Sequence, residues 1–167
     1  MPEITAYHQL GRFVVEFQAT EALLNEVMGL IANSDQEAVS ILANDLEFSR
    51  RVKTADVLFA RFAGLKGKDV AEETKEFHAV MVELGKLGER RNNLVHSNYF
   101  DWMDSDGNRG LLRKHSKLQG AKGQREETVE ELRPDAFDAD LASIAAARAR
   151  LEALRLKSID WLYPIEA

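Results

Sequence analysis

The chain has 167 residues, of which 45% are hydrophobic and 30% charged, and its formal net charge is −6. This composition excludes a disordered or fibrous protein and predicts a single domain over residues 1–167 that can bury a substantial core. The acidic balance disfavours long-range attraction of nucleic acid, and the absence of cysteine excludes disulfides, thiol nucleophiles and cysteine-ligated zinc.

The first part of the chain has the apolar spacing of amphipathic helices. A helix is predicted over about residues 5–32, because one broad face would present Leu10, Phe13, Val14, Phe17, Leu24, Val27, Met28 and Ile31. Ser34 followed by Glu37 has the spacing of a capping box. It would start a short helix with Val39, Ile41 and Leu42. A further helix, ended by Gly64 and Gly67, would bear Leu46, Phe48, Val52, Val57, Leu58 and Phe62.

Two longer helices are predicted further along the chain. Asp69 would cap a helix from Ala71 to about Tyr99, whose apolar stripe contains Phe77, Val80, Met81, Leu84, Leu87, Leu94 and Val95. After Pro134, which suits the first turn of a helix, a last helix ending near Trp161 would bear Phe137, Leu141, Ile144, Leu151 and Leu154. Four or five helices with short connections predict an all-α fold, an antiparallel four- to five-helix bundle.

Residues 98–133 break this helical pattern. Tyr99 to Trp102 alternate between aromatic and polar character, and Asp106-Gly107 is typical of a tight turn between strands. Leu111-Leu112 and Thr128-Val129 have the character of short strands. We therefore expect a small β-hairpin inserted into the bundle before the last helix.

The expected hairpin contains a basic run. From position 109 to position 125 there is no Asp or Glu and there are six basic residues, namely Arg109, Arg113, Lys114, Lys117, Lys122 and Arg125. One interpretation is an ordinary solvated loop. The other is a surface that contacts RNA phosphates through Arg113, Lys114 and Lys117.

The end of the helix from Ala71 combines an arginine, an amide and a histidine. Arg91 falls within the apolar stripe, where a guanidinium is costly unless it is paired or reaches an opening. At about 100° per residue, His96 points roughly 140° away from Arg91. Convergence of the two needs the reach of the arginine, a distortion at the helix end, or a second copy of the chain. The structural alternative is an arginine paired inside the bundle with a carboxylate, such as that of Asp45, Glu47 or Asp56.

The spacing Arg91-Asn92-x-x-x-His96 resembles the signature of HEPN domains, in which an arginine, usually followed by a polar residue, precedes a histidine with four to six residues between them, near the end of a long helix. The resemblance covers about residues 5–100 and 134–162. It implies a metal-independent endoribonuclease that needs no cofactor and leaves 2′,3′-cyclic phosphate and 5′-hydroxyl ends. Such domains occur as toxins of toxin–antitoxin pairs and in antiviral defence systems, and others are inactive binding or regulatory modules.

In the implied reaction, His96 is the general acid or base and Arg91 holds the scissile phosphate. Asn92 orients His96 or bonds a phosphate oxygen. Arg90 projects toward solvent on an ideal helix and is expected to be a secondary RNA contact or an ordinary surface charge. Tyr99 stands three residues after His96, whereas a subset of the family has an antitoxin-modified tyrosine two residues after it. We therefore expect Tyr99 to stack on a base or to pack the hairpin onto the bundle.

The expected partners follow from the same pattern. A homodimer is predicted with the motif helix near its interface, because Gly85 would let another helix approach closely. RNA is the expected substrate, and a cognate antitoxin or another protein is the expected partner. The competing function is a non-enzymatic interaction or regulatory module in which Arg91 and His96 are structural. We expect a cytoplasmic location, no membrane association and no metal, because the chain shows no membrane-spanning apolar run, signal peptide or metal-ligand spacing.

Overall fold

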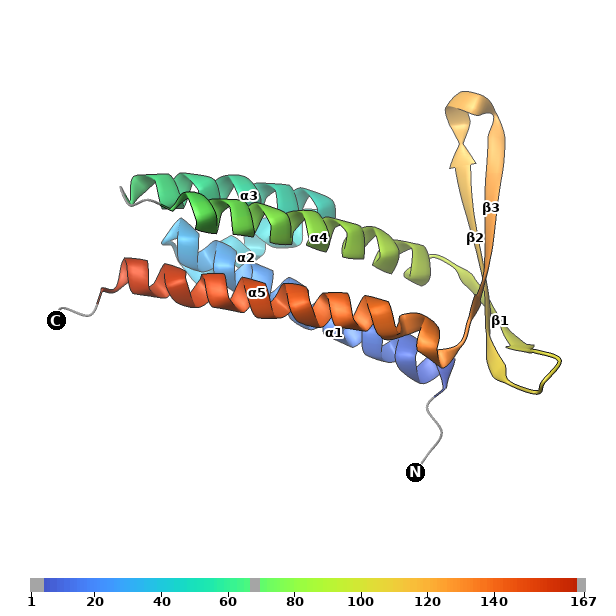
Figure 1. The fold of residues 1–167 in the computed structure, drawn as a ribbon. Coiled ribbons are helices and arrows are strands. Elements are labelled where there is room, and N and C mark those ends of the chain that lie inside the picture. Colours follow the sequence, from blue (N-terminus) through green and yellow to red (C-terminus); the bar gives the residue numbers. More distant parts are fainter. Residues whose placement is uncertain (1–4, 67–69, 165–167) are drawn as a thin grey trace.

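The computed structural model describes residues 5–66 and 70–164, which form a helical body with a small sheet at one end (Figure 1). The helices are α1 (Ala6–Ala32), α2 (Gln36–Asn44), α3 (Phe48–Leu65), α4 (Ala71–Val95) and α5 (Asp138–Leu162). The antiparallel sheet has the order β1 (Asn98–Met103), β2 (Arg109–Gln119) and β3 (Gln124–Leu132). The helix-rich fold is confirmed, but the fold is not purely α, and the inserted segment has three strands where one hairpin was predicted.

The directions of the helices follow from their connections. Helix α4 packs antiparallel to α3 and to α5, as predicted for a bundle (Figure 1). Helices α1 and α5 also pack side by side, but both begin at the sheet end and run in the same direction. The reason is that the sheet connects α4 to α5 without crossing to the far end of the bundle. The chain leaves α4 at the sheet end and enters α5 at that same end, through the short 3₁₀ helix Pro134–Phe137.

Aromatic packing joins the helices in the core. Phe59 of α3 stacks on Phe77 of α4 with ring centroids 4.1 Å apart, and both side chains are buried. Phe17 of α1 meets Phe48 of α3 edge-on at 4.8 Å between centroids. Such contacts add to the free energy gained by removing the rings from water. They fix the spacing of α1, α3 and α4, the three helices around the predicted motif.

Several predicted helix details differ from the structure. The side chain of Asp35, and not Ser34, caps α2 by accepting a hydrogen bond from the backbone N–H of Glu37 at 2.9 Å. The side chains of three predicted apolar positions are mainly exposed: Ile41, Leu42 and Val57. The predicted helix stop at Gly67 and the predicted cap at Asp69 lie outside the described residues.

The sheet is anchored to the helices by leucines. Leu111 of β2 and Leu132 of β3 face each other in register, and both are completely buried in the core. The turn between β1 and β2 contains Gly107 with φ of 84°, a left-handed conformation that favours glycine, in agreement with the predicted Asp106-Gly107 turn. Beyond the leucines, β2 and β3 continue as a ribbon that projects away from the helical body (Figure 1).

Candidate functional site

Helix α4 ends just before the histidine of the motif. Val95 is its last residue, and His96 has φ of −97° and ψ of 23°, so the backbone leaves the helix at this position. The backbone N–H of His96 donates to the carbonyl oxygen of Asn92 at 3.0 Å. The helix was predicted to continue to Tyr99, but β1 already starts at Asn98. The chain therefore leaves the helix after His96, whose own N–H still makes a helical hydrogen bond.

The motif side chains line one cavity of about 350 Å³. Its walls come from α1, the α2–α3 connection, α3 and the end of α4, and comprise Phe17, Glu21, Leu46, Glu47, Phe48, Ser49, Arg51, Gly88, Arg91, Asn92 and His96. Asn92 and His96 are exposed and Arg91 is partly buried. All three predicted catalytic residues thus share a cavity within a single copy of the chain. The alternative that needs a second copy to bring Arg91 and His96 together is not required for convergence.

Arg91 is held by its neighbour and not by a carboxylate. Its Nη1 donates to Oδ1 of Asn92 at 3.1 Å, and its Nε is buried without an acceptor. Among the described residues, no Asp or Glu forms an ion pair with Arg91. Of the three carboxylates considered from the sequence, Glu47 lines the same cavity, while Asp56 pairs with His78 at 2.7 Å. The guanidinium of Arg91 therefore retains hydrogen-bonding capacity at the cavity.

The sequence interpretation missed Arg51, a second arginine of this cavity. Arg51 is 6% exposed, and its Nη1 donates to Oε1 of Glu21 at 2.6 Å. Its Nη2 donates to the carbonyl oxygen of Leu46 at 3.1 Å, while its Nε is buried without an acceptor. The signal was present in the sequence, because Arg51 shares the buried stripe of α3 with Ala55 and Phe59 at four-residue spacing. It is the same anomaly that singled out Arg91 on α4.

Arg90 does not project toward solvent, so that prediction is wrong. Its Nε donates to Asp140 of α5 at 2.9 Å, and its Nη atoms donate to Glu130 of β3 at 3.0 and 3.1 Å. The sheet and α5 cover this side of α4, which an ideal helix drawn alone does not reveal. Arg90 thus connects α4 to the sheet and to α5.

Arg113, another predicted RNA contact, is also inside this network. It is 5% exposed and donates from Nε to Glu130 at 2.8 Å, and from Nη1 to the carbonyl oxygen of Asn93 at 3.1 Å. Burial opposes ionisation of Glu130, but the guanidiniums of Arg90 and Arg113 outweigh it and lower the pKa of this carboxyl. The four-element junction of α4, β2, β3 and α5 is therefore held by charge-assisted hydrogen bonds.

Tyr99 packs the sheet against the end of α4. Its hydroxyl donates to the carbonyl oxygen of Leu94 at 2.6 Å, and its ring is partly buried against the core. Burial raises the pKa of the Tyr99 hydroxyl. This contact agrees with the packing interpretation of Tyr99 and leaves little of the ring free to stack on a base.

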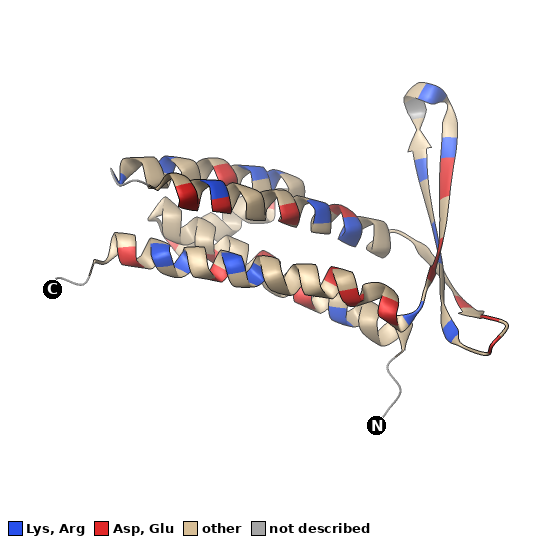
Figure 2. Cartoon of the chain, viewed as in Figure 1, with Lys and Arg blue, Asp and Glu red and all other residues tan. Residues whose placement is uncertain are grey.

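The basic run on β2 is matched by acidic residues on β3. Lys117 stands opposite Glu126 in the register, and the ammonium of Lys114 lies 5.4 Å from the ring centroid of Phe100. The acidic residues of β3 are Glu126, Glu127, Glu130 and Glu131. Figure 2 shows both signs of charge along the projecting ribbon. Of the six basic residues, Arg113 and Lys117 stand opposite glutamates of β3, so the run does not form a purely positive surface.

A groove of about 330 Å³ between α3 and α4 adjoins the motif cavity, and both are lined by Phe48, Ser49, Gly88 and Asn92. Gly85 opens onto it, because a Cβ atom built at this position would meet no atom within 4 Å. A Cβ atom at Gly88 would instead lie 2.6 Å from the ring of Phe48. The face of α4 around Gly85 is thus free of packing, while α3 covers Gly88.

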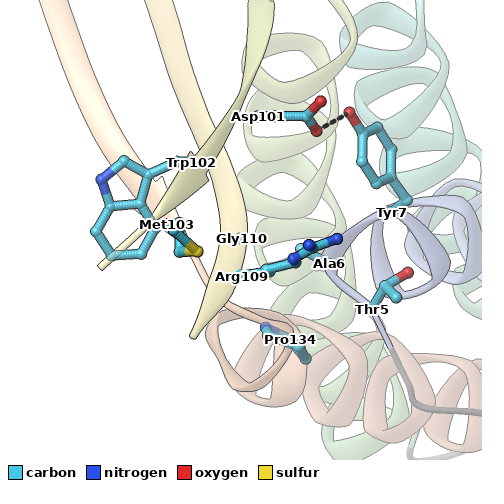
Figure 3. A pocket seen from close by; sticks show the side chains of 9 residues that line it. All are labelled: Thr5, Ala6, Tyr7, Asp101, Trp102, Met103, Arg109, Gly110 and Pro134. Carbon is cyan, nitrogen blue, oxygen red and sulfur yellow. Dashed lines mark hydrogen bonds between the residues drawn. The ribbon is translucent and has the colours of Figure 1, made fainter. Parts of the chain in front are cut away.

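A separate cavity of about 520 Å³ lies where the start of α1 meets β1 and β2 (Figure 3). Across it the hydroxyl of Tyr7 donates to Oδ1 of Asp101 at 2.8 Å. This hydrogen bond, together with burial and the negative charge of Asp101, raises the pKa of the Tyr7 hydroxyl. None of its lining residues belongs to the motif cavity.

Two features are absent from residues 5–66 and 70–164. No group of three or more His, Asp or Glu side chains lies close enough together to hold a metal ion. No helix in the same residues has the length and hydropathy to cross a membrane. Comparison of the chain with protein-family models, curated proteins and solved structures found no match in any of the three.

Proposed function

We propose that this protein is a HEPN-like, metal-independent endoribonuclease that acts on RNA in the cytoplasm. The observation that supports the proposal best is the shared cavity of Arg91, Asn92 and His96. Exposure of His96 and the lack of a carboxylate on Arg91 leave both side chains able to meet a ligand. A role as a toxin or defence component, controlled by a cognate antitoxin, is part of this proposal.

The proposed reaction is an internal phosphoryl transfer. The ribose 2′-oxygen forms a bond to phosphorus, the bond from phosphorus to the 5′-oxygen breaks, and a 2′,3′-cyclic phosphate results. One proton leaves the 2′-hydroxyl and another reaches the departing 5′-oxygen. His96 transfers one of these protons, because imidazole changes charge near neutral pH. Arg91 donates hydrogen bonds to the phosphate oxygens, where negative charge increases in the transition state, and Asn92 fixes the position of Arg91.

A homodimer through the Gly85 face of α4 is proposed as the working form. The open groove beside Gly85 would admit a helix of a second copy next to the motif cavity. Because the motif side chains converge within one chain, the dimer would extend the RNA-binding surface and is not needed to complete the motif. Sedimentation at micromolar concentration tests this, and a strictly monomeric protein would contradict the dimer.

The same groove favours the competing proposal, a non-enzymatic interaction or regulatory module. In that case Arg91 and His96 would only hold the end of α4, and a partner protein would occupy the face around Gly85. The two functions differ in chemistry, so an activity measurement separates them directly.

The test is RNA cleavage in the presence of a chelator. Purified protein should cut single-stranded RNA without added metal and should spare DNA, which lacks the 2′-hydroxyl. His96→Ala should lose cleavage by about 10²- to 10⁴-fold, the usual contribution of one proton-transfer group, and should keep its melting temperature because His96 is exposed. Magnesium-dependent cleavage, or equal cleavage of DNA, would contradict the proposed mechanism.

A further inference from the structure

The cavity lined by Arg91, Asn92 and His96 is also lined by a second arginine, Arg51, which is not part of the motif. Arg51 of α3 and Arg91 of α4 come from different helices and line the same cavity. Both have a buried Nε–H with no acceptor among the residues that the structure describes. A buried donor without a partner costs free energy, more so when the group is charged. Because these Nε atoms are buried, a ligand in the cavity would meet the Nη groups of the two arginines, which carry four N–H donors each.

The amino end of α3 lines the cavity as well. Phe48 and Ser49, the first two residues of this 18-residue helix, are lining residues. The first amides of a helix have no intrahelical acceptor, and Glu47, at the N-cap, makes no side-chain capping bond to them. The first turn of α3 also contains no acidic residue. Such a helix start attracts anions through its free N–H groups and its dipole.

Two carboxylates that line the cavity, Glu21 and Glu47, reduce its net positive charge. Glu21 is engaged by Arg51 in an ion pair, and the exposed Glu47 stands at the rim without an ion pair in the described part of the chain. With the charges of Glu21 and Arg51 paired, Arg91 and the start of α3 face Glu47. Neutralising Glu47 should therefore strengthen the binding of an anion.

We infer that the motif cavity binds a phosphate group between Arg51, Arg91 and the amino end of α3, and that Arg51 is a phosphate-binding residue. Each Nη nitrogen of a guanidinium carries two N–H groups, so the Nη atoms of Arg51 that donate to Glu21 and Leu46 each keep a second N–H for a phosphate oxygen. The inference rests on the same cavity as the proposed function, but it requires binding only and not cleavage. The phosphate can belong to an RNA backbone or to a small phosphorylated molecule.

The experiment is a calorimetric titration of the full chain with inorganic phosphate. Wild type should bind at millimolar phosphate, and Arg51→Gln should weaken binding by about tenfold or more, as expected for the loss of one charged hydrogen-bonding contact. Arg50→Gln is the matched control, because Arg50 is the exposed neighbour on the same turn and does not line the cavity. Its binding should stay within about twofold of wild type, since its charge is exposed to water.

Two further variants keep the test decisive. Arg51→Lys preserves the charge beside Glu21, so it should fold even if Arg51→Gln does not, and its loss of the guanidinium fork should still weaken phosphate binding. Glu47→Gln should tighten binding a few-fold, because it removes a negative charge from the lining of the cavity. No phosphate binding by wild type, or equal binding by the Arg50 and Arg51 variants, would overturn the inference.

An RNA oligonucleotide with 2′-O-methyl riboses, which cannot be cleaved by internal transfer, distinguishes the source of the phosphate. Competition between this oligonucleotide and phosphate assigns the cavity to RNA, whereas phosphate binding without competition assigns it to a small phosphorylated molecule. Wild type that binds phosphate but does not cut RNA would refute the proposed function and keep this inference. RNA cleavage by wild type, together with unchanged phosphate binding in Arg51→Gln and Arg51→Lys, would refute this inference and keep the proposed function.

Discussion

Replacing Arg113 by alanine should destabilise the protein much more than it weakens any contact with RNA. The side chain is 5% exposed and donates three hydrogen bonds, to Glu130 at 2.8 Å and to Asn93 and Ser97 at 3.1 Å each. Breaking a buried ion pair costs about 3–5 kcal/mol. Here Glu130 keeps the hydrogen bonds of Arg90, so we expect a loss at or just below the lower limit of this range, about 2–3 kcal/mol.

Thermal unfolding followed by circular dichroism measures this loss. For a chain of this size, each kcal/mol corresponds to about 2–4 °C, so the melting temperature of Arg113→Ala should fall by roughly 5–10 °C. Lys117→Ala is the matched control, since it removes an exposed cation from the same strand and should change stability by less than about 0.5 kcal/mol. Equal melting temperatures of the two variants, with RNA affinity lost only in Arg113→Ala, would refute the structural role of Arg113.

Three further predictions concern the sheet and the motif helix. The pKa of Glu130 is lowered in the folded protein, so ionised Glu130 stabilises the fold above the ordinary carboxyl pKa, and this stabilisation is lost as pH falls. In denaturant titrations, the difference in unfolding free energy between wild type and Glu130→Gln should therefore shrink at acidic pH. Gly85→Ala should stabilise the monomer by about 0.5–1 kcal/mol and weaken the proposed dimer in sedimentation, while Gly88→Ala should cost about 1–3 kcal/mol through its clash with a phenylalanine ring. Neutralising Lys114 and Lys117 together should make the plot of log binding constant against log salt concentration less steep for single-stranded RNA, by at most about 1.4 in slope. No change in this slope would show that the ribbon does not contact RNA.

Helices α1, α3, α4 and α5 could be predicted because each buries an apolar stripe of helical period, whereas α2 buries only Ala43. The projecting half of the sheet could not, since Lys117 pairs with Glu126 where apolar alternation would otherwise mark a strand. Likewise, the wrong orientation of Arg90 arose because Glu130 and Asp140, which pair with it, are distant in sequence. These errors concern contacts between different helices and strands, and such contacts cannot be predicted from the apolar periodicity of a single helix or strand.

The candidate site was predictable in part. The pattern identified Arg91, Asn92 and His96, but an ideal helix separated the arginine from the histidine, because a helix drawn alone does not show the cavity that α1, α3 and α4 form around both. Arg51 could have been found by the argument applied to Arg91, a charged side chain on a buried stripe. That it faces the same cavity depends on how α3 packs against α4, which the sequence alone does not specify.

The central claim is that His96 transfers a proton during attack by a ribose 2′-hydroxyl. The most direct measurement uses a DNA oligonucleotide with a single internal ribonucleotide, incubated with excess protein and a chelator. Wild type should cut only on the 3′ side of that ribonucleotide and leave a 2′,3′-cyclic phosphate, and His96→Ala should cut at least about 100-fold more slowly. Cleavage at deoxyribonucleotides, a linear phosphate as the first product, or equal rates for the two proteins would contradict the claim.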